Sequence, residues 1–156
     1  MIELTVPGVG ELHLEHLVLD LNGTIAQDGE VLPGVTERLG DIAQRLDVHL
    51  LSADTRGLAA DTAHQLGVHL HRVSSGQEQE QKREFVAGLG ADTVIAMGNG
   101  SNDSQMLREA ALGIAVMGSE GLAVAALHAA DVVVACIQDA LDLIGHPQRL
   151  IATTRR

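Results

Sequence analysis

The chain of 156 residues has the length of one domain, and its 46% hydrophobic and 20% charged residues are typical of a globular protein that buries a core. Its formal net charge of −11, one Phe and no Trp or Tyr exclude nucleic acid as a partner, since phosphates would be repelled and bases would find no aromatic platform. One cysteine, no apolar leader and no apolar run of membrane-spanning length predict a cytoplasmic protein without membrane insertion.

The first predicted element is an antiparallel hairpin, half exposed. Residues 2–6 alternate between apolar and polar side chains, Pro7-Gly8 supplies a turn, and the alternation resumes over residues 11–14. The apolar run Leu17–Leu19 does not alternate, which is typical of a strand covered on both faces, and it ends at Asp20. We therefore expect a single domain over residues 1–156, with an N-terminal β-hairpin over 1–15 and a Rossmann-like core over 16–156.

Downstream of Asp20, helical and strand patterns alternate. The expected helices cover residues 35–46, 58–66, 77–89, 102–110, 121–129 and 137–144, and the expected strands cover residues 48–51, 68–73, 93–97, 113–117 and 132–134. A last helical turn or two is predicted over residues 147–153. Because strands that alternate with helices across short loops require a parallel sheet covered on both faces, the predicted fold class is α/β, a three-layer, Rossmann-like, doubly wound sheet.

Polar residues follow three of these strands, at the sheet edge where ligands bind in such folds. Asp20 leaves a buried strand for a sharp turn, where a carboxylate can serve as a nucleophile or a metal ligand. Ser52 offers a hydroxyl, and the N–H groups after it are expected to begin the next helix, a natural anion site. Lys82 can bring a point charge to a phosphate. The loop Gly98–Asp103 places oxygen ligands close together at a helix start. These groups together describe phosphoryl transfer through an aspartyl phosphate.

The ordered motifs Asp20–Thr24, Ser52–Asp54, Lys82 and Gly98–Asp103 resemble those of the haloacid-dehalogenase-like (HAD) superfamily, in particular the soluble relatives of the P-type ATPase phosphorylation domain. Each motif alone is also an ordinary turn, helix cap or surface lysine, so the interpretation depends on all four occurring at one sheet edge. The resemblance covers residues 16–135 and implies a HAD-like fold.

The resemblance also implies roles for individual residues. Asp20 would attack phosphorus and carry the covalent phosphate, and the implied catalytic set is Asp20, Asn22, Ser52 and Lys82. Phosphate would be bound by Gly23, Ser52, Ala53, Lys82 and Asn102. The implied cofactor is Mg²⁺, held by Asp20, the backbone carbonyl of Asn22, Asn99 and, through a water, Asp103.

Two positions depart from the family pattern. The phosphatases of the superfamily carry a second Asp where this chain has Asn22, and an amide can neither protonate a leaving group nor activate water, a loss of about 10²–10⁴-fold in rate. A metal-binding Asp is usual where this chain has Asn99, so Mg²⁺ should bind more weakly. The implied function is a slow Mg²⁺-dependent phosphatase. A catalytically weakened phosphate-binding or regulatory module, and a P-type-ATPase-like domain with a long-lived phosphoenzyme, remain open.

The spacing of the motifs leaves no room for a cap domain. Between Asn22 and Ser52 the sequence holds a short flap over residues 25–32 and one helix, and no domain-sized insert fits between Ser52 and Lys82. The resemblance therefore implies a capless member, which acts on a macromolecular phosphorylated substrate or gains its lid from a neighbouring subunit of a homo-oligomer.

Eight histidines raise the question of a second kind of metal site. His69 and His71 share a strand face, and His13 lies close to His16 in the sequence. No third ligand has a suitable spacing, so we predict no histidine metal site.

Overall fold

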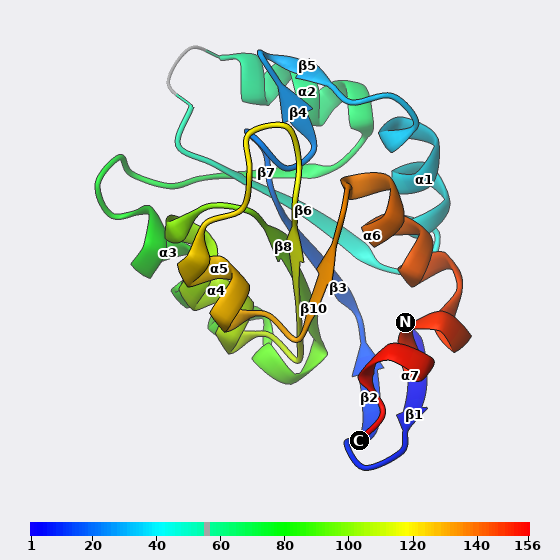
Figure 1. The fold of residues 1–156 in the computed structure, drawn as a ribbon. Coiled ribbons are helices and arrows are strands. Elements are labelled where there is room, and N and C mark those ends of the chain that lie inside the picture. The colour runs from blue at the N-terminus through cyan, green and yellow to red at the C-terminus, as the bar shows by residue number, and fades with distance from the viewer. Residues whose placement is uncertain (55–56) are drawn as a thin grey trace.

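A six-stranded parallel sheet forms the centre of the computed structural model, which describes residues 1–54 and 57–156 (Figure 1). The strand order is β10–β9–β8–β3–β6–β7, and every pairing within this sheet is parallel. The strands are β3 (His16–Asp20), β6 (Asp47–Ser52), β7 (His69–Arg72), β8 (Val94–Gly98), β9 (Leu112–Val116) and β10 (Val132–Val134). The chain runs outward from β3 in both directions, which makes β3 the switch point of the doubly wound sheet.

Helices cover both faces of this sheet. They are α1 (Val35–Ile42), α2 (Leu58–Leu66), α3 (Glu78–Leu89), α4 (Ser104–Glu109), α5 (Val124–Ala129), α6 (Ile137–Gly145) and α7 (Pro147–Thr154), with 3-10 turns at Ala91–Thr93 and Ser101–Asp103. One core holds the buried side chains of α1, α2, α6 and α7, and the other holds those of α3, α4 and α5. The predicted three-layer α/β architecture is confirmed.

Three helices are shorter than their apolar spacing predicts. Helix α1 ends at Ile42, because the chain tightens there into turns in which Arg45 N–H donates to Ile42 O at 2.9 Å. Leu46 stays buried even though it lies outside the helix. Helix α4 begins only at Ser104, after a 3-10 turn. Helix α5 begins only at Val124, since the segment before it is bound to the β8 loop instead. Apolar periodicity therefore marks which residues are buried, but not where the helical hydrogen bonds end.

The N-terminal hairpin forms as predicted. Strands β1 (Ile2–Val6) and β2 (Gly10–Leu14) pair antiparallel, and their inward-facing side chains join the core that includes α7. The C-terminus lies beside the turn of this hairpin, where Arg156 N–H donates to Pro7 O at 2.9 Å, whereas the N-terminus lies at the opposite end of β1 (Figure 1).

The connections between the sheet strands hold no inserted domain in the described part of the chain. Between β3 and β6 lie the small hairpin β4 (Ala26–Gln27) and β5 (Glu30–Val31), followed by α1. Between β6 and α3, the described residues form α2 and β7. This arrangement confirms the predicted absence of a cap domain. Among the described residues, no helix is both long enough and apolar enough to cross a membrane.

Candidate functional site

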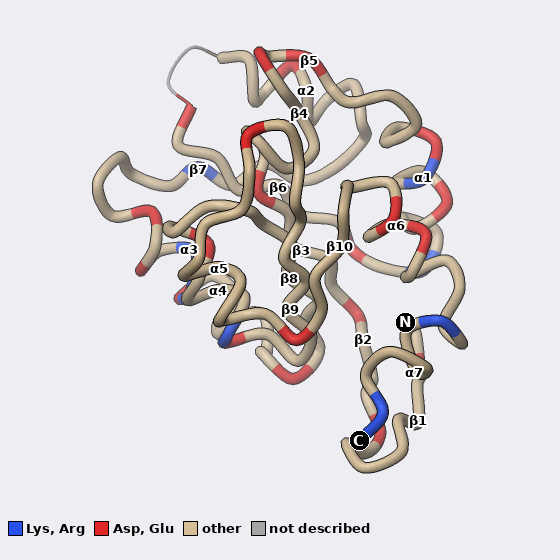
Figure 2. Tube along the Cα trace, viewed as in Figure 1, with Lys and Arg blue, Asp and Glu red and all other residues tan. Residues whose placement is uncertain are grey.

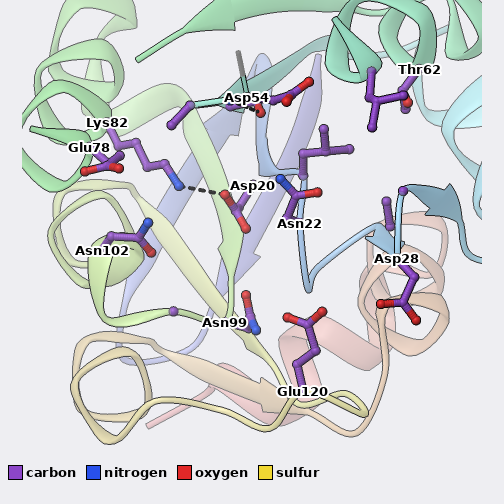
Figure 3. Close-up of a pocket in the computed structure, with 17 residues that line it drawn as sticks. Asp20, Asn22, Asp28, Asp54, Thr62, Glu78, Lys82, Asn99, Asn102 and Glu120 are labelled. Atoms are coloured by element: carbon purple, nitrogen blue, oxygen red, sulfur yellow. Dashed lines mark hydrogen bonds and ion pairs between the residues drawn. The ribbon is translucent and has the colours of Figure 1, made fainter. Parts of the chain in front are cut away.

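Asp20 lies at the carboxyl end of β3, the central strand at which the strand order reverses. Its side chain is buried and is held at both oxygens, by Lys82 at one of them (Figure 3) and by Thr24 at the other. Lys82 Nζ donates to Asp20 Oδ1 at 2.6 Å, and Thr24 Oγ1 donates to Asp20 Oδ2 at 3.2 Å. The carboxylate is therefore oriented before any ligand binds, as nucleophilic catalysis requires.

Lys82 is the only lysine of the chain, which also has nine arginines. It projects from α3 and is 1% exposed. Its ammonium also donates to Asp103 Oδ1, at 2.7 Å, so that one cation joins two carboxylates. A compact ammonium on a flexible stem can reach both oxygens in this buried space, whereas a planar guanidinium is larger and has a fixed fork.

The three buried charges leave one negative charge uncompensated. Burial, and after it the nearby charge of Asp103, raise the pKa of Asp20 to about 7, against the opposing effect of Lys82. Burial disfavours the charge on Lys82 as well, but the two carboxylates outweigh it and raise the pKa of Lys82 above its ordinary value. A site with this charge balance favours an additional cation near Asp20.

The loop after β8 is closed by Asp103. Its second oxygen, Oδ2, accepts the N–H groups of Asn99 at 3.0 Å and Gly100 at 2.9 Å. Gly98 makes this possible, because a Cβ at that position would lie 2.5 Å from Asp103 Cγ. Asp103 is fully buried and does not line the cavity described below. Its direct contacts are thus with Lys82 and the loop backbone.

The turn after β3 brings the first motif against the β8 loop. Gly23 adopts φ +80°, so the backbone favours glycine, and a Cβ there would lie 2.5 Å from Glu120 Oε2 and displace that side chain. Thr24 is buried, and its Oγ1 also lies 3.2 Å from Asn99 Oδ1, so that its one hydroxyl hydrogen is shared between that amide oxygen and Asp20. The sequence motif includes Thr24, but its bridging role depends on a residue 75 positions away.

Ser52 lies where predicted, at the carboxyl end of β6, but the segment after it differs from expectation. Ser52 Oγ accepts Asp54 N–H at 3.0 Å, and Asp54 Oδ2 accepts Ala59 N–H at 2.9 Å in the first turn of α2. Helix α2 begins at Leu58, where it was predicted, so the expected anion site of helix N–H groups lies six residues after Ser52 and not directly beside it. Side-chain hydrogen bonds thus hold the N–H groups of Asp54 and Ala59. Part of this segment, residues 55–56, lies outside the described residues.

A cavity of about 850 Å³ opens over these residues (Figure 3). Seven of the predicted site residues line it, namely Asp20, Asn22, Ser52, Ala53, Lys82, Asn99 and Asn102. Gly23 and Asp103 do not line it. The structure thus brings the four sequence motifs to one place.

The cavity wall also includes acidic residues that sequence reasoning did not select, Asp28, Asp54, Glu78 and Glu120. Figure 2 shows acidic positions on the β4–β5 hairpin and on the loop between β9 and α5, both at the carboxyl end of β3. The rule that ligands bind at strand carboxyl ends would have found Glu120, which lies four residues after β9. Nothing in the sequence pattern indicates Asp28 or Glu78.

The donor atoms around Asp20 suit a hard divalent cation. The side chains of Asp20 and Asn99 offer carboxylate and amide oxygens within one hydrogen-bonded group. Oxygen donors of this kind are the ones that Mg²⁺ prefers. Together with the uncompensated negative charge at Asp20, they fit the cofactor that the sequence motifs imply.

A second cluster of titratable groups lies elsewhere on the sheet. His49 Nε2 is 3.2 Å from His16 Nδ1, and His49 Nδ1 is 3.2 Å from His71 Nε2. Burial, followed by His71, His16 and His69, lowers the pKa of His49 to about 4. In the described part of the chain no group of three or more His, Cys, Asp or Glu side chains is arranged to hold a metal ion. Sequence spacing missed this row because its members come from the adjacent strands β3, β6 and β7.

The chain has close relatives by sequence, although no family model matches it. Over 88 residues it is 48% identical to the uncharacterized protein MJ0073 of Methanocaldococcus jannaschii, covering 54% of this chain and 95% of that protein. Over 82 residues it is 34% identical to the chloroplastic copper-transporting ATPase PAA1 of Arabidopsis thaliana, covering 51% of this chain but only 9% of the ATPase.

Solved structures that resemble the chain include HAD-family hydrolases and 3-deoxy-D-manno-octulosonate 8-phosphate phosphatases. The phosphatase of Moraxella catarrhalis, determined with magnesium, phosphate and KDO, superposes with a TM-score of 0.66 at 18% identity, over 92% of this chain and 94% of that one. At this identity the likeness shows the fold. The chain therefore belongs to one family with MJ0073, and it has the capless fold of the haloacid-dehalogenase-like superfamily.

Proposed function

We propose that this protein is a Mg²⁺-dependent phosphatase that works through an aspartyl phosphate on Asp20. The observation that carries the proposal is the buried contact of Asp20 with Lys82 at the switch point of the sheet, which holds a carboxylate and a cation at the mouth of a cavity. Phosphatase neighbours in the solved structures support the phosphorylated substrate, and the magnesium bound to one of them supports the cofactor.

The proposed reaction has two steps. In the first, an Asp20 oxygen forms a bond to phosphorus while the bond between phosphorus and the leaving-group oxygen breaks. In the second, water attacks the same phosphorus, releasing inorganic phosphate and restoring the carboxylate. A bound Mg²⁺ would neutralise charge on the transferring phosphoryl group. Because Asn22 cannot donate or accept the proton in either step, we propose that turnover is slow.

We assign the remaining residues as the motifs imply. Phosphate oxygens would be held by Gly23, Ser52, Ala53, Lys82 and Asn102. The cation would be held by Asp20, the Asn22 carbonyl and Asn99, with Asp103 acting through a water. The observed contacts of Asp103 with Lys82 and the loop N–H groups support a further role for it in fixing Lys82 and Asn99 in place.

The test is phosphoryl transfer from acetyl phosphate and p-nitrophenyl phosphate in the presence of Mg²⁺, followed by turnover and by the intact mass of the protein. Wild type should release phosphate, and Asp20→Asn should release none. A matched control is Asp92→Asn, which removes an exposed carboxylate from the 3-10 turn before β8, at the opposite end of that strand. Asp92→Asn should behave as wild type. Phosphatase activity that survives in Asp20→Asn would contradict the proposal.

A second candidate is a domain that forms a long-lived phosphoenzyme, as the resemblance to P-type ATPases implies. It is favoured by the amide of Asn22 in the cavity wall and by the 34% identity with a copper-transporting ATPase. The same assay separates the two candidates. A stable mass increase of one phosphoryl group on Asp20, with little phosphate released, supports the second, and a binding or regulatory module would show neither.

The shape and charge of the cavity guide the choice of substrate. Since no cap covers it among the described residues, we propose a macromolecular phosphorylated substrate, or a lid supplied by a second copy of the chain in a homo-oligomer. The net charge of −11 and the acidic cavity wall disfavour nucleic acid. We further propose that the chain acts as a single domain in the cytoplasm.

A further inference from the structure

Glu120 places a carboxylate beside the neutral amide of Asn99. A Cβ built on Gly23 would lie 2.5 Å from Glu120 Oε2 and 2.8 Å from Asn99 Nδ2, so both atoms lie close to the same point. Figure 3 shows the Glu120 carboxylate directed into the cavity next to Asn99. Within the described part of the chain, Glu120 forms no hydrogen bond or ion pair. Its charge is therefore available to a ligand.

The loop that carries Glu120 is fastened on both sides of it. Ser119 Oγ donates to Gln27 Oε1 at 2.6 Å, which ties the loop to strand β4. Gly121 O accepts Asn99 Nδ2 at 3.5 Å, and Ala123 N–H donates to Asn99 O at 2.9 Å, which ties it to the β8 loop. These contacts hold the backbone of Glu120 against the two turns that frame Asp20.

The amide of Asn99 is oriented to suit this neighbour. Its oxygen faces Thr24 and Asp20, and its nitrogen faces the Gly121 carbonyl and the Glu120 carboxylate. If the Asn99 amide were turned the other way, its oxygen would face two acceptors, the Gly121 carbonyl and the Glu120 carboxylate. The neutral amide and the acidic neighbour are therefore complementary, and the negative charge lies one side chain away from Asn99.

The charges of the site show what this carboxylate adds. Asp20, Asp103 and Lys82 together carry one excess negative charge, and Asp103 is occupied by Lys82 and two backbone N–H groups. A divalent cation at Asp20 would leave an excess of positive charge. The carboxylate of Glu120 supplies the second negative charge that balances such an ion.

We propose that Glu120 helps to bind the divalent cation, supplying from the β9–α5 loop the charge that Asn99 does not carry. The inference rests on the proposed Mg²⁺ site and deepens it. Glu120 acts on the cation directly or through one of its waters, and it takes no part in the bonds that form and break at phosphorus.

The test measures Mg²⁺ binding to the whole chain without substrate, by calorimetric titration, with Mn²⁺ and its paramagnetic resonance signal as a second probe. Glu120→Gln should raise the dissociation constant for either ion by about tenfold. The double variant Asn99→Asp/Glu120→Gln removes the carboxylate at position 120 and places one at position 99, beside Asp20. It should restore the dissociation constant of the ion to near the wild-type value. Melting curves of the metal-free variants check that each is folded.

The matched control is Glu78→Gln, which removes the same charge from the wall of the same cavity near Lys82, away from Asn99 (Figure 3). It should weaken binding by no more than about twofold. Equal losses in Glu120→Gln and Glu78→Gln would overturn the inference, because they would reflect only the overall field of the cavity. Unchanged binding in Glu120→Gln would overturn it as well.

The inference and the proposed function fail in different ways. If activity requires Asp20 and Mg²⁺ but Glu120→Gln binds the ion as wild type does, the inference fails and the function stands. If Glu120→Gln weakens binding but no phosphate is transferred in wild type, the inference stands and the function fails. If wild type binds neither Mg²⁺ nor Mn²⁺, both fail.

Discussion

Asp20→Asn should make the metal-free protein more stable at neutral and higher pH while abolishing phosphoryl transfer. The amide has the shape of the neutral carboxyl, and its oxygen can still accept the Lys82 ammonium at the position of Oδ1. Thr24 Oγ1 can accept from the new amide nitrogen instead of donating to Oδ2. The substitution therefore removes a buried charge with little change in packing.

The magnitude follows from the raised pKa of Asp20. In the fold this pKa is raised from 3.8 to about 7, first by burial and then by Asp103. Since one pKa unit corresponds to about 1.4 kcal/mol, ionising Asp20 in the fold costs about 4 kcal/mol relative to the unfolded chain. For a chain of this length that difference corresponds to a rise in Tm of roughly 10 °C in the variant.

The pH dependence has a defined sign. Because the folded-state pKa lies above the ordinary value, the stabilisation from the neutral carboxyl is complete below about pH 3.8 and is lost as the pH rises through about 7. Wild type and Asp20→Asn should therefore have similar free energies of unfolding near pH 4. The difference should open between pH 4 and 7 and stay constant above it.

The assay is urea unfolding of both proteins at several pH values in the presence of a chelator, with Asp92→Asn as the control for removal of an exposed charge. At pH 8, adding Mg²⁺ should narrow the difference in free energy of unfolding between the two proteins, because an ion that binds only the folded wild type stabilises the wild type alone. The reasoning is refuted if Asp20→Asn is no more stable than wild type at pH 8. A difference that is the same at pH 4 and pH 8 would refute it too.

Three further predictions concern other residues of the two clusters. Lys82→Met leaves Asp20 and Asp103 buried without their cation, so it should lower the free energy of unfolding at pH 8 by about 3 kcal/mol or more, measured by urea unfolding. Asn22→Asp restores a proton donor and acceptor in the cavity wall, so kcat/KM should rise by up to about 10²-fold for alkyl phosphates and by less for p-nitrophenyl phosphate. In the fold the pKa of His49 is lowered to about 4, so the stabilisation from its neutral form is complete above about pH 6.5 and is lost as the pH falls toward 4. In His49→Leu, the Tm should therefore fall less over this pH range than it does in wild type.

Each of these has its own contrary outcome. Lys82→Met with wild-type stability would mean that Asp20 and Asp103 are not held by the ammonium. For Asn22→Asp, an equal rise in kcat/KM for alkyl phosphates and p-nitrophenyl phosphate would mean that position 22 does not protonate the leaving group. If His49→Leu loses as much thermal stability as wild type when the pH falls toward 4, groups other than His49 cause that loss. The matched control is His13→Gln, in the exposed hairpin.

Much of the fold could be read from local patterns. Alternating and uninterrupted apolar runs identify the hairpin and the buried strand before Asp20, because side-chain direction repeats every two residues in a strand. The helix over residues 58–66 ends at Gly67, which adopts φ +66° as a terminating glycine does. Strand–helix alternation then determines a parallel sheet, and a parallel sheet places strand carboxyl ends on one edge. Three of the four motifs meet at that edge for this reason, and Lys82 reaches it from α3.

The sequence by itself thus determined the α/β fold, the missing cap and which motifs lie together. Only the tertiary structure decided that Lys82 joins Asp20 to Asp103, that Thr24 bridges to Asn99, that Glu120 lies beside that amide and that three histidines form a row. Local periodicity reports on a few neighbouring residues, and it cannot reveal contacts across 20 to 100 positions. Those contacts, and the pKa values they set, depend on which strands are neighbours and on how deeply each side chain is buried.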